Sequence, residues 1–217
     1  MLFRSHPQTP TGHVWSEDEL RRIAEVADEH DLLVVSDEIH SDLTFAPHAH
    51  RPFALFSPNR TVTVTAASKA FNLAALRYAV MHVGPEHLLA TVKSAPDHLY
   101  GAANLFGAEA ARAAWSEGDD WFTAVMAHLD LQRHRLADLL AEHLPGVVYT
   151  PPAATYLAWL DCRALGLGDD PSEEFARRGV RLSEGPNFGS EGRGHVRLNF
   201  ATSGAVLETI VTRMAGR

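Results

Sequence analysis

Hydrophobic positions in the first third of the chain switch between helix-like and strand-like spacing. Apolar residues recur every three or four positions over 20–27, and Ser16 with Glu19 forms the capping-box pattern that begins many helices. Two continuous apolar or β-branched runs follow, at 32–35 and Thr61–Thr65, and each predicts a buried strand of a parallel sheet. Helix and strand in this order predict an α/β fold.

The same pattern analysis extends to the rest of the chain. A third strand is predicted at 78–83, and apolar spacing predicts helices at 85–95, 105–115 and 119–143. Beyond Pro145 and Gly146 the pattern changes to short strands mixed with helices: strands at 147–149, 156–160 and 195–200, helices near 171–178 and 205–215. We therefore predict two domains, 1–125 and 126–217. The first has a mostly parallel sheet with helices, and the second is a small α+β domain.

Composition narrows the class of protein. The 217 residues are 46% hydrophobic, enough for a sizeable core, and a formal net charge of -8 argues against a nucleic-acid partner. Apolar runs are too short for a membrane span, and the N-terminus lacks a signal-peptide pattern. The single Cys162 fits a reducing compartment and is expected in the core. We expect a soluble, cytoplasmic protein without a membrane partner. No metal site is expected, because His48 and His50 are two among 13 scattered histidines.

Lysine is rare in this chain, which favours arginine. The 19 Lys+Arg residues include only two lysines, Lys69 and Lys93. Lys69 follows the predicted strand Thr61–Thr65. A desolvated lysine amine can lose its proton and form a Schiff base with a carbonyl, which a guanidinium cannot do. For Lys69 taken alone, a surface residue at the end of a strand is the simpler interpretation, and its neighbours change this.

Two further charged residues stand near predicted strand ends. Asp37 follows the run at 32–35, and a carboxylate there can hold a positive charge at the edge where open α/β sheets bind ligands. Arg77 lies in the loop beyond Lys69, and its rigid fork suits bidentate binding of a phosphate. A carboxylate, a lysine and an arginine at successive strand ends match a ring nitrogen, an aldehyde and a phosphate. Pyridoxal 5′-phosphate carries all three groups.

Four motifs resemble those of a known family: Pro10-Thr11-Gly12, Ser36-Asp37-Glu38-Ile39-His40, Ser68-Lys69-Ala70-Phe71-Asn72-Leu73-Ala74 and Val196-Arg197-Leu198-Asn199-Phe200-Ala201-Thr202. Through them the chain resembles the C-terminal part of fold-type I pyridoxal-phosphate enzymes of the class I/II aminotransferase family. Within that family it most resembles the cystathionine β-lyase branch of the MalY/PatB type. His40 favours this branch, because many aminotransferases carry tyrosine at that position.

The resemblance implies a role for each matching residue. Lys69 would bind the cofactor aldehyde and shuttle the Cα proton of the substrate, and Asp37 would keep the pyridine nitrogen protonated. Arg197 would bind the α-carboxylate of an amino-acid substrate. The other implied cofactor-binding residues are Thr9, His40, Ser68 and Arg77, with Arg77 on the phosphate and His40 near the 3′-oxygen side.

The function implied by the resemblance is that of a C–S β-lyase acting on S-substituted cysteine-type amino acids. An aminotransferase of the same family is one alternative. A truncated, non-catalytic fragment is another, because the segment that the family carries ahead of this region has no counterpart here. A homodimer is implied for the intact protein. The sequence does not give the natural substrate.

Two positions depart from the family pattern. Thr9 stands where the family has an asparagine that binds the 3′-oxygen of the cofactor, and Ala66 where a hydroxyl residue often contacts the phosphate. Each loss is expected to weaken cofactor binding by roughly 1–2 kcal/mol. The missing preceding segment also predicts open sheet edges and exposed apolar faces.

Overall fold

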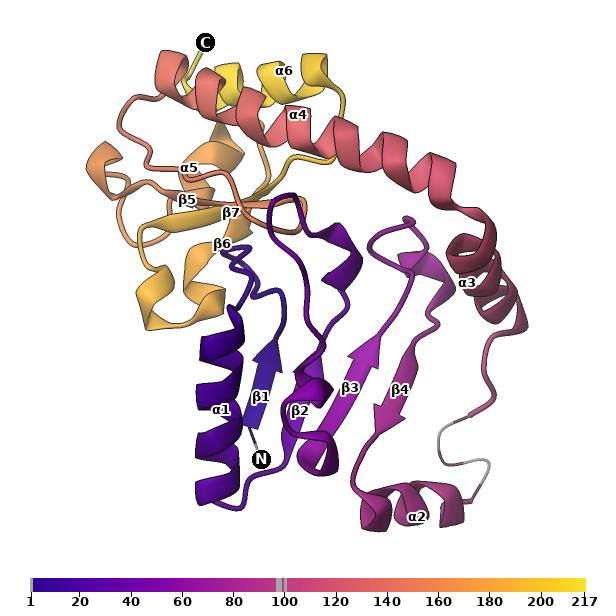
Figure 1. The fold of residues 1–217 in the computed structure, drawn as a ribbon. Coiled ribbons are helices and arrows are strands. Elements are labelled where there is room, and N and C mark those ends of the chain that lie inside the picture. The colour runs from indigo at the N-terminus through magenta and orange to yellow at the C-terminus, as the bar shows by residue number, and fades with distance from the viewer. Residues whose placement is uncertain (1, 97–98, 100) are drawn as a thin grey trace. The chain divides into compact units, whose positions relative to one another are not determined.

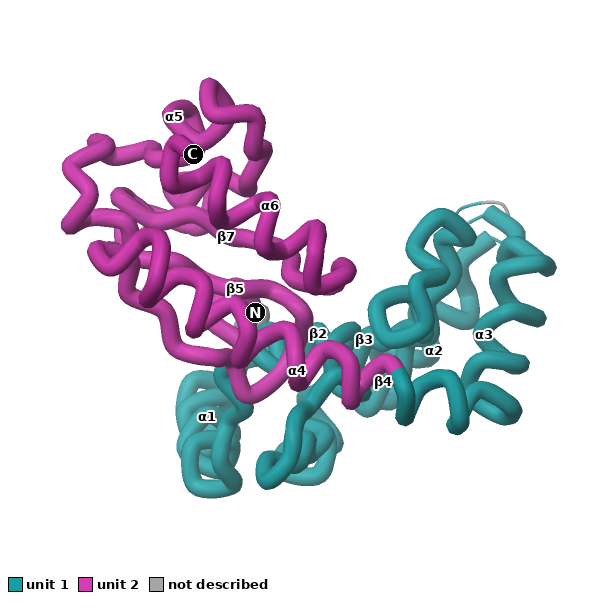
Figure 2. Tube along the Cα trace, turned by 90° about the horizontal axis from the view of Figure 1, so that it is seen from above, with its two compact units in different colours: residues 1–8, 13–124 teal, residues 9–12, 125–217 magenta. Residues whose placement is uncertain are grey.

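The computed structural model describes residues 2–96, 99 and 101–217, which form two compact units (Figure 2). Unit 1 contains the chain up to Gln8 and from His13 to Ala124, and unit 2 contains Thr9–Gly12 and Val125–Arg217. The third and last crossing between the units lies inside helix α4 (Asp119–His143).

Unit 1 is built on a four-stranded sheet in the order β1-β2-β3-β4 (Figure 1). The strands are β1 (Leu2–Ser5), β2 (Val34–Asp37), β3 (Thr61–Thr65) and β4 (Val80–Val83). The first three run parallel, and β4 runs antiparallel to β3. The predicted α/β class is therefore confirmed, and its parallel sheet ends in one antiparallel strand.

Strand β2 begins later than the run at 32–35 predicts. The Leu32 amide donates to the Ala27 carbonyl at 2.7 Å, so Leu32 closes the end of the preceding helix instead of opening the strand. Burial along β2 alternates, with Val34 and Ser36 buried and the two residues between and after them half-buried. The prediction that this strand is buried on both faces is wrong, because one face of β2 is only partly covered.

Strand β4 is shorter than predicted and exposed. It starts at Val80 instead of residue 78, and its Val80 and Met81 side chains are 40% and 50% exposed. Within the part of the chain that the structure describes, β1 and β4 are the outer strands of the sheet. The open edges and exposed apolar side chains expected from the sequence are present.

Helix α1 (Glu17–Glu29) covers part of the sheet and begins at the predicted cap. The Ser16 side chain accepts from the Glu19 amide at 3.3 Å, and the Glu19 carboxylate accepts from the Ser16 amide at 2.7 Å. Its inward face packs into one core with β2 and the loop before β3: Leu20, Ala24, Ala27, Val34 and Phe53.

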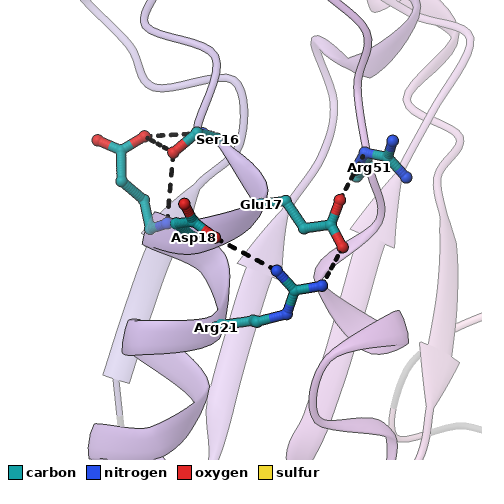
Figure 3. A network of polar contacts seen from close by, with 6 residues as sticks. Ser16, Glu17, Asp18, Arg21 and Arg51 are labelled. Atoms are coloured by element: carbon teal, nitrogen blue, oxygen red, sulfur yellow. Dashed lines mark hydrogen bonds and ion pairs between the residues drawn. The ribbon is translucent and has the colours of Figure 1, made fainter.

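A polar network joins the start of α1 to the loop ahead of β3 (Figure 3). Arg21 binds Glu17 and Asp18 on its own helix. The Arg51 guanidinium approaches the same Glu17 carboxylate at 3.7 Å. The helix start and the loop carrying Arg51 are therefore held together by charge as well as by their shared core.

The remaining helices of unit 1 follow the predictions. They are α2 (Glu86–Ser94), α3 (Leu105–Glu117) and the first turns of α4. Among the helices of the described residues, none has the length and apolar character needed to cross a membrane.

Unit 2 contains a three-stranded antiparallel sheet in the order β5-β7-β6, with β5 (Leu157–Asp161), β6 (Ser183–Glu184) and β7 (His195–Asn199). Helices α5 (Ser172–Arg177) and α6 (Gly204–Met214) accompany it. The strand predicted at 147–149 is wrong. Only Val148 forms an isolated bridge, to Asp161, and its side chain is 65% exposed. Pro145 on one side and Pro151 on the other limit the pairing, since proline lacks an amide donor.

The core of unit 2 includes the single cysteine. Cys162 is fully buried, as predicted, and burial raises the pKa of its thiol to about 12. The segment before α1 also packs here, because the Ala154 amide donates to the Gly12 carbonyl at 3.1 Å. Gly12 has a φ of +71°, and a Cβ at this position would lie 2.4 Å from Cβ of Pro152, so only glycine fits.

Candidate functional site

Three predicted site residues lie at or just beyond the carboxyl ends of β2 and β3, and these strand ends can be followed in Figure 1. Asp37 is the last residue of β2 and pairs in register with Val64 of β3. The loop after β3 carries Lys69 and Arg77 and returns into β4 at the same edge, where the first residue of β4 pairs with the last residue of β3. The carboxyl edge of parallel strands is where open α/β sheets bind ligands.

Lys69 lies in a compact turn held by small buried residues. Ala66 and Ala67 are 2% exposed, and Ala70 is 3% exposed. The Phe71 amide donates to the Ala67 carbonyl at 2.9 Å, which closes the turn around the lysine. Because alanine has no side chain beyond Cβ, the turn can sit tightly on the protein, and half-buried Lys69 is its one long polar side chain.

An aromatic cluster anchors this turn. The Phe71 ring stacks on Trp121 with centroids 5.6 Å apart and lies 5.4 Å from the Phe122 ring. A Cβ at Gly118 would approach the Phe71 ring to 2.7 Å, so the start of α4 comes close to it. Sequence reasoning assigned Trp121 only to an apolar helix position. Its contact with the lysine turn depends on tertiary packing.

Arg77 is held in a left-handed backbone conformation, with a φ of 50°. Such a conformation costs about 1–3 kcal/mol for a residue with a side chain and persists only when its surroundings enforce it. Here the start of α3 does so. Asn104 caps that helix by accepting from the Phe106 amide, and its Nδ2 donates to the Leu76 carbonyl at 2.9 Å. Sequence reasoning missed Asn104, whose one local signal is its place before the predicted helix.

The charges of Asp37, Lys69 and Arg77 are not neutralised by ion pairs within the described residues. Asp37 Oδ1 accepts from the Ile39 amide at 3.2 Å, and no described cation pairs with it. Lys69 and Arg77 likewise have no carboxylate partner in that part of the chain. One negative and two positive groups at a ligand-binding edge fit a cofactor with a protonated ring nitrogen, an aldehyde and a phosphate.

The other two predicted residues of unit 1 lie at the same edge. His40 follows β2, is 6% exposed, and accepts from the Leu43 amide at 3.0 Å through its carbonyl. Ser68 precedes the lysine in the turn, and its carbonyl accepts from the Leu73 amide at 3.0 Å. The structure therefore brings five predicted residues to one edge: Asp37, His40, Ser68, Lys69 and Arg77.

Glu38 is a buried carboxylate in the motif Ser36-Asp37-Glu38-Ile39-His40, and the sequence predicted no role for it. It accepts from Ser36 Oγ at 2.8 Å, the Phe53 amide at 3.0 Å and His50 Nε2 at 2.9 Å. Burial by itself raises the pKa of Glu38, but the bonds from His50, Phe53 and Ser36 outweigh it and the net shift is downward. The carboxylate therefore stays ionised.

No group of three or more His, Cys, Asp or Glu in the described residues is arranged to hold a metal ion.

The remaining predicted residues, Thr9 and Arg197, belong to unit 2. The Arg197 guanidinium lies 4.7 Å from the centroid of the Phe188 ring, and it donates to Ser183 Oγ at 3.4 Å. Desolvation lowers the pKa of Arg197, while neighbouring Tyr156 acts in the opposite direction. Arg197 has no carboxylate partner in the described part of the chain, so its fork is available to an anion.

Comparison with known proteins gives evidence of the family to which this chain belongs. Residues 1–214 match the family model described as aminotransferase class I and II. The chain is 35% identical to cystathionine beta-lyase PatB of Bacillus subtilis, with 99% of this chain and 57% of the relative covered. It is 32% identical to an aspartate aminotransferase of Musicola paradisiaca, with 99% of this chain and 54% of the relative covered.

The fold of this chain is also similar to that of a solved structure. The crystal structure of the PLP-bound C-S lyase from Staphylococcus hominis superposes with a TM-score of 0.92 at 31% identity. The match covers 99% of this chain and 57% of that one. This chain thus spans somewhat more than half the length of the relatives it matches.

Proposed function

This chain belongs to the aminotransferase class I and II family, and on that premise we propose that the unit 1 sheet edge binds pyridoxal 5′-phosphate. Asp37 would hold the ring nitrogen, Lys69 the aldehyde carbon and Arg77 the phosphate. The observation that carries the proposal is the meeting of these three charges at one sheet edge, without ion-pair partners among the residues that the structure describes. His40, Ser68 and Thr9 are proposed as further cofactor contacts.

The reaction we propose is C–S β-lyase chemistry on S-substituted cysteine-type amino acids. The bound cofactor supplies an electron sink that stabilises negative charge at the substrate Cα. The Lys69 amine would take the Cα proton as general base, and Arg197 would bind the α-carboxylate in a bidentate manner. Overall, the substrate and water give a thiol, pyruvate and ammonia.

The similarity to proteins named as lyases supports this reaction. The similarity to an aspartate aminotransferase supports transamination as a second candidate. Both reactions need the same Cα proton removal by Lys69. After that proton is removed, the lyase releases the sulfur group, whereas the aminotransferase transfers the amino group to a 2-oxo acid.

The two units would serve different parts of this chemistry. We propose unit 1 as the C-terminal part of a cofactor-binding domain and unit 2 as a small domain that supplies Arg197. Because the chain spans little more than half of its relatives, the activity is proposed for the whole protein carrying this segment. The homodimer and the cytoplasmic location stay predictions for that protein.

The chain offers a matched pair of variants for testing the lysine. Lys69→Ala should abolish the visible absorbance band of lysine-bound cofactor, whereas Lys93→Ala, at the other lysine and exposed on α2, should retain it. Reduction with borohydride followed by peptide mass spectrometry should place the cofactor on Lys69. A folded wild-type chain without this band would contradict cofactor binding by this chain.

If the band appears, product analysis distinguishes the two reactions. Pyruvate released from cystathionine without a 2-oxo acid supports the lyase. Amino transfer that depends on an added 2-oxo acid supports the aminotransferase.

A further inference from the structure

We propose that Glu38, together with His50, is the positioning pair that fixes Asp37 at the sheet edge. The inference rests on the proposed function, in which Asp37 holds the ring nitrogen of the cofactor. Glu38 itself would not touch the cofactor, because its carboxylate is already bound within the protein, by Ser36, His50 and the Phe53 amide. Its role would be to determine where the neighbouring carboxylate lies.

The first support is the way Glu38 is bound. Its side chain is buried, with 4% of the residue exposed, yet it carries a charge that is costly to bury. Three donors from two parts of the chain converge on it: Ser36 Oγ in β2, and His50 Nε2 and the Phe53 amide in the loop before β3. An ionised carboxylate only accepts, so the His50 ring donates through Nε2. Donors that converge in this way allow Glu38 one position.

The second support is the backbone around Glu38. Its amide donates to the Val64 carbonyl at 2.8 Å, and its carbonyl accepts from Thr65 Oγ1 at 3.3 Å. Both peptide groups flanking the Glu38 Cα are therefore bound to β3. Asp37, one residue earlier, accepts from the His6 amide at 2.8 Å through its carbonyl. A fixed residue 38 therefore leaves Asp37 little freedom to shift along or across the sheet.

The third support is the loop that carries His50 and Phe53. Phe53 is buried in the core under α1, and Arg51 approaches Glu17 of that helix (Figure 3). The His6 ring lies against His50 with centroids 4.3 Å apart and donates to the Arg51 carbonyl at 2.9 Å. The loop is thus anchored on α1 and β1, and Glu38 links that anchor to the sheet edge.

The test compares variants at the pair with a variant that only weakens the fold. Glu38→Ala removes the carboxylate, Glu38→Gln keeps its shape without its charge, and His50→Gln replaces the ring donor by an amide. Glu25→Gly, at an exposed position of α1, is the control, because glycine destabilises a helix without touching the edge or the core that holds Phe53. Three properties are measured on the full chain: the melting temperature, the NMR signals of the Asp37 carboxyl carbon and the Ile39 amide, and the dissociation constant for pyridoxal 5′-phosphate.

We expect Glu38→Ala to shift the Asp37 and Ile39 signals and to weaken cofactor binding about 10-fold or more, as for a displaced binding group. Glu38→Gln should recover most of both, since its amide oxygen can still accept from Ser36 and the Phe53 amide. His50→Gln should lie between them. Glu25→Gly should lower the melting temperature and leave the Asp37 signal and the cofactor affinity unchanged.

The proposal is wrong if Glu38→Ala, or His50→Gln where Glu38→Ala does not fold, behaves like Glu25→Gly in both NMR and affinity. Failure of the proposed function looks different. In that case wild type and variants alike fail to bind the cofactor, while the Asp37 and Ile39 signals, recorded without cofactor, still show whether Glu38 fixes Asp37.

Discussion

The two sheets of this chain differ in how their charged residues are paired. At the edge of the unit 1 sheet, Asp37, Lys69 and Arg77 have no ion-pair partner in the described residues. On the unit 2 sheet, Asp161 at the end of β5 binds the Arg163 guanidinium at 2.6 Å, and this bond is the main reason that the pKa of Asp161 falls to about 2. A carboxylate at a strand end is therefore paired locally in one unit and lacks an ion-pair partner among the described residues in the other.

The strand environments show the same contrast. β5 and β7 are mostly buried, with Leu160, Val196 and Leu198 at most 1% exposed, so the unit 2 sheet packs into a core of its own. β4 of unit 1 is exposed along most of its length. In unit 2, most of the sheet is buried and the Asp161 carboxylate is paired within the unit. At the carboxyl edge of the unit 1 sheet, three charges stay unpaired among the described residues, and the proposed cofactor site rests on them.

The strongest test of the contrast exchanges the two strand-end carboxylates for alanine. Asp37→Ala should weaken pyridoxal-phosphate binding at least about 100-fold, the usual scale for losing a buried charge-assisted contact, and change stability by no more than about 0.5 kcal/mol. Asp161→Ala should leave cofactor binding intact and cost about 1 kcal/mol. Cofactor titration and urea unfolding measure both. Equal effects of the two variants on binding would remove the distinction.

The second prediction concerns pH: acid should destabilise unit 1 before unit 2. Burial, and secondly the neighbouring His50, lowers the pKa of His6 to about 4 from a usual 6.5, so His6 is neutral in the folded protein. The unfolded chain takes up this proton first, and the stabilisation is complete above pH 6.5 and lost as the pH falls toward 4. The full effect is about 3 kcal/mol. The downward shift of Glu38 acts in the same direction at lower pH.

Unit 2 should resist this range of pH. The stabilisation from Asp161 is present above its usual pKa of 3.8 and is lost only as the pH falls toward 2. Hydrogen exchange at pH 7 and pH 4.5 should show loss of protection in unit 1 ahead of unit 2. His6→Gln should reduce the difference. Loss of protection in both units together, unchanged by His6→Gln, would show that another group controls acid unfolding.

Local signals explain what could be predicted of the fold. The cap at Ser16, the β-branched run Thr61–Thr65 and the long apolar spacing of Asp119–His143 each determine an element from neighbouring residues, and each predicts its element to within a residue or two. β6 is two residues long and gives no such signal. The direction of β4 depends on a loop returning to the edge it left, which is a tertiary property.

The candidate site likewise contains residues that the sequence predicts and residues that it does not. Asp37, Lys69 and Arg77 could be found because residue type and position after a strand are visible in the sequence. The partners that hold them could not. His50 reaches Glu38 through a loop that the core under α1 holds in place, and Asn104 reaches the residue before Arg77 from another helix. Such support depends on packing between distant segments.

Arg197 offers a third test, because it is the arginine in the unit 2 sheet that lacks a carboxylate partner in the described residues. Arg197→Ala should lower kcat/KM for the amino-acid substrate by about 10- to 100-fold, the equivalent of a lost charge-assisted bond of roughly 2 kcal/mol. Cofactor affinity should stay unchanged. Arg163→Ala, which removes the paired arginine, is the control and should not alter kcat/KM. Reduced cofactor affinity in Arg197→Ala would reassign this residue.

The smallest predicted effect concerns backbone strain at Arg77. Because Arg77 adopts a φ of 50°, Arg77→Gly should relieve strain and raise the free energy of unfolding by up to about 1 kcal/mol. The same change removes the proposed phosphate ligand, so cofactor affinity should fall while stability rises. Arg60→Gly is the contrasting variant. Arg60 lies in a right-handed 3₁₀ turn and binds Asp28 and Asp31, so its replacement should only destabilise. Urea unfolding and cofactor titration on both variants provide the measurement. A loss of stability in Arg77→Gly would mean that the guanidinium serves the fold, and the sheet edge of unit 1 would then resemble the self-contained sheet of unit 2.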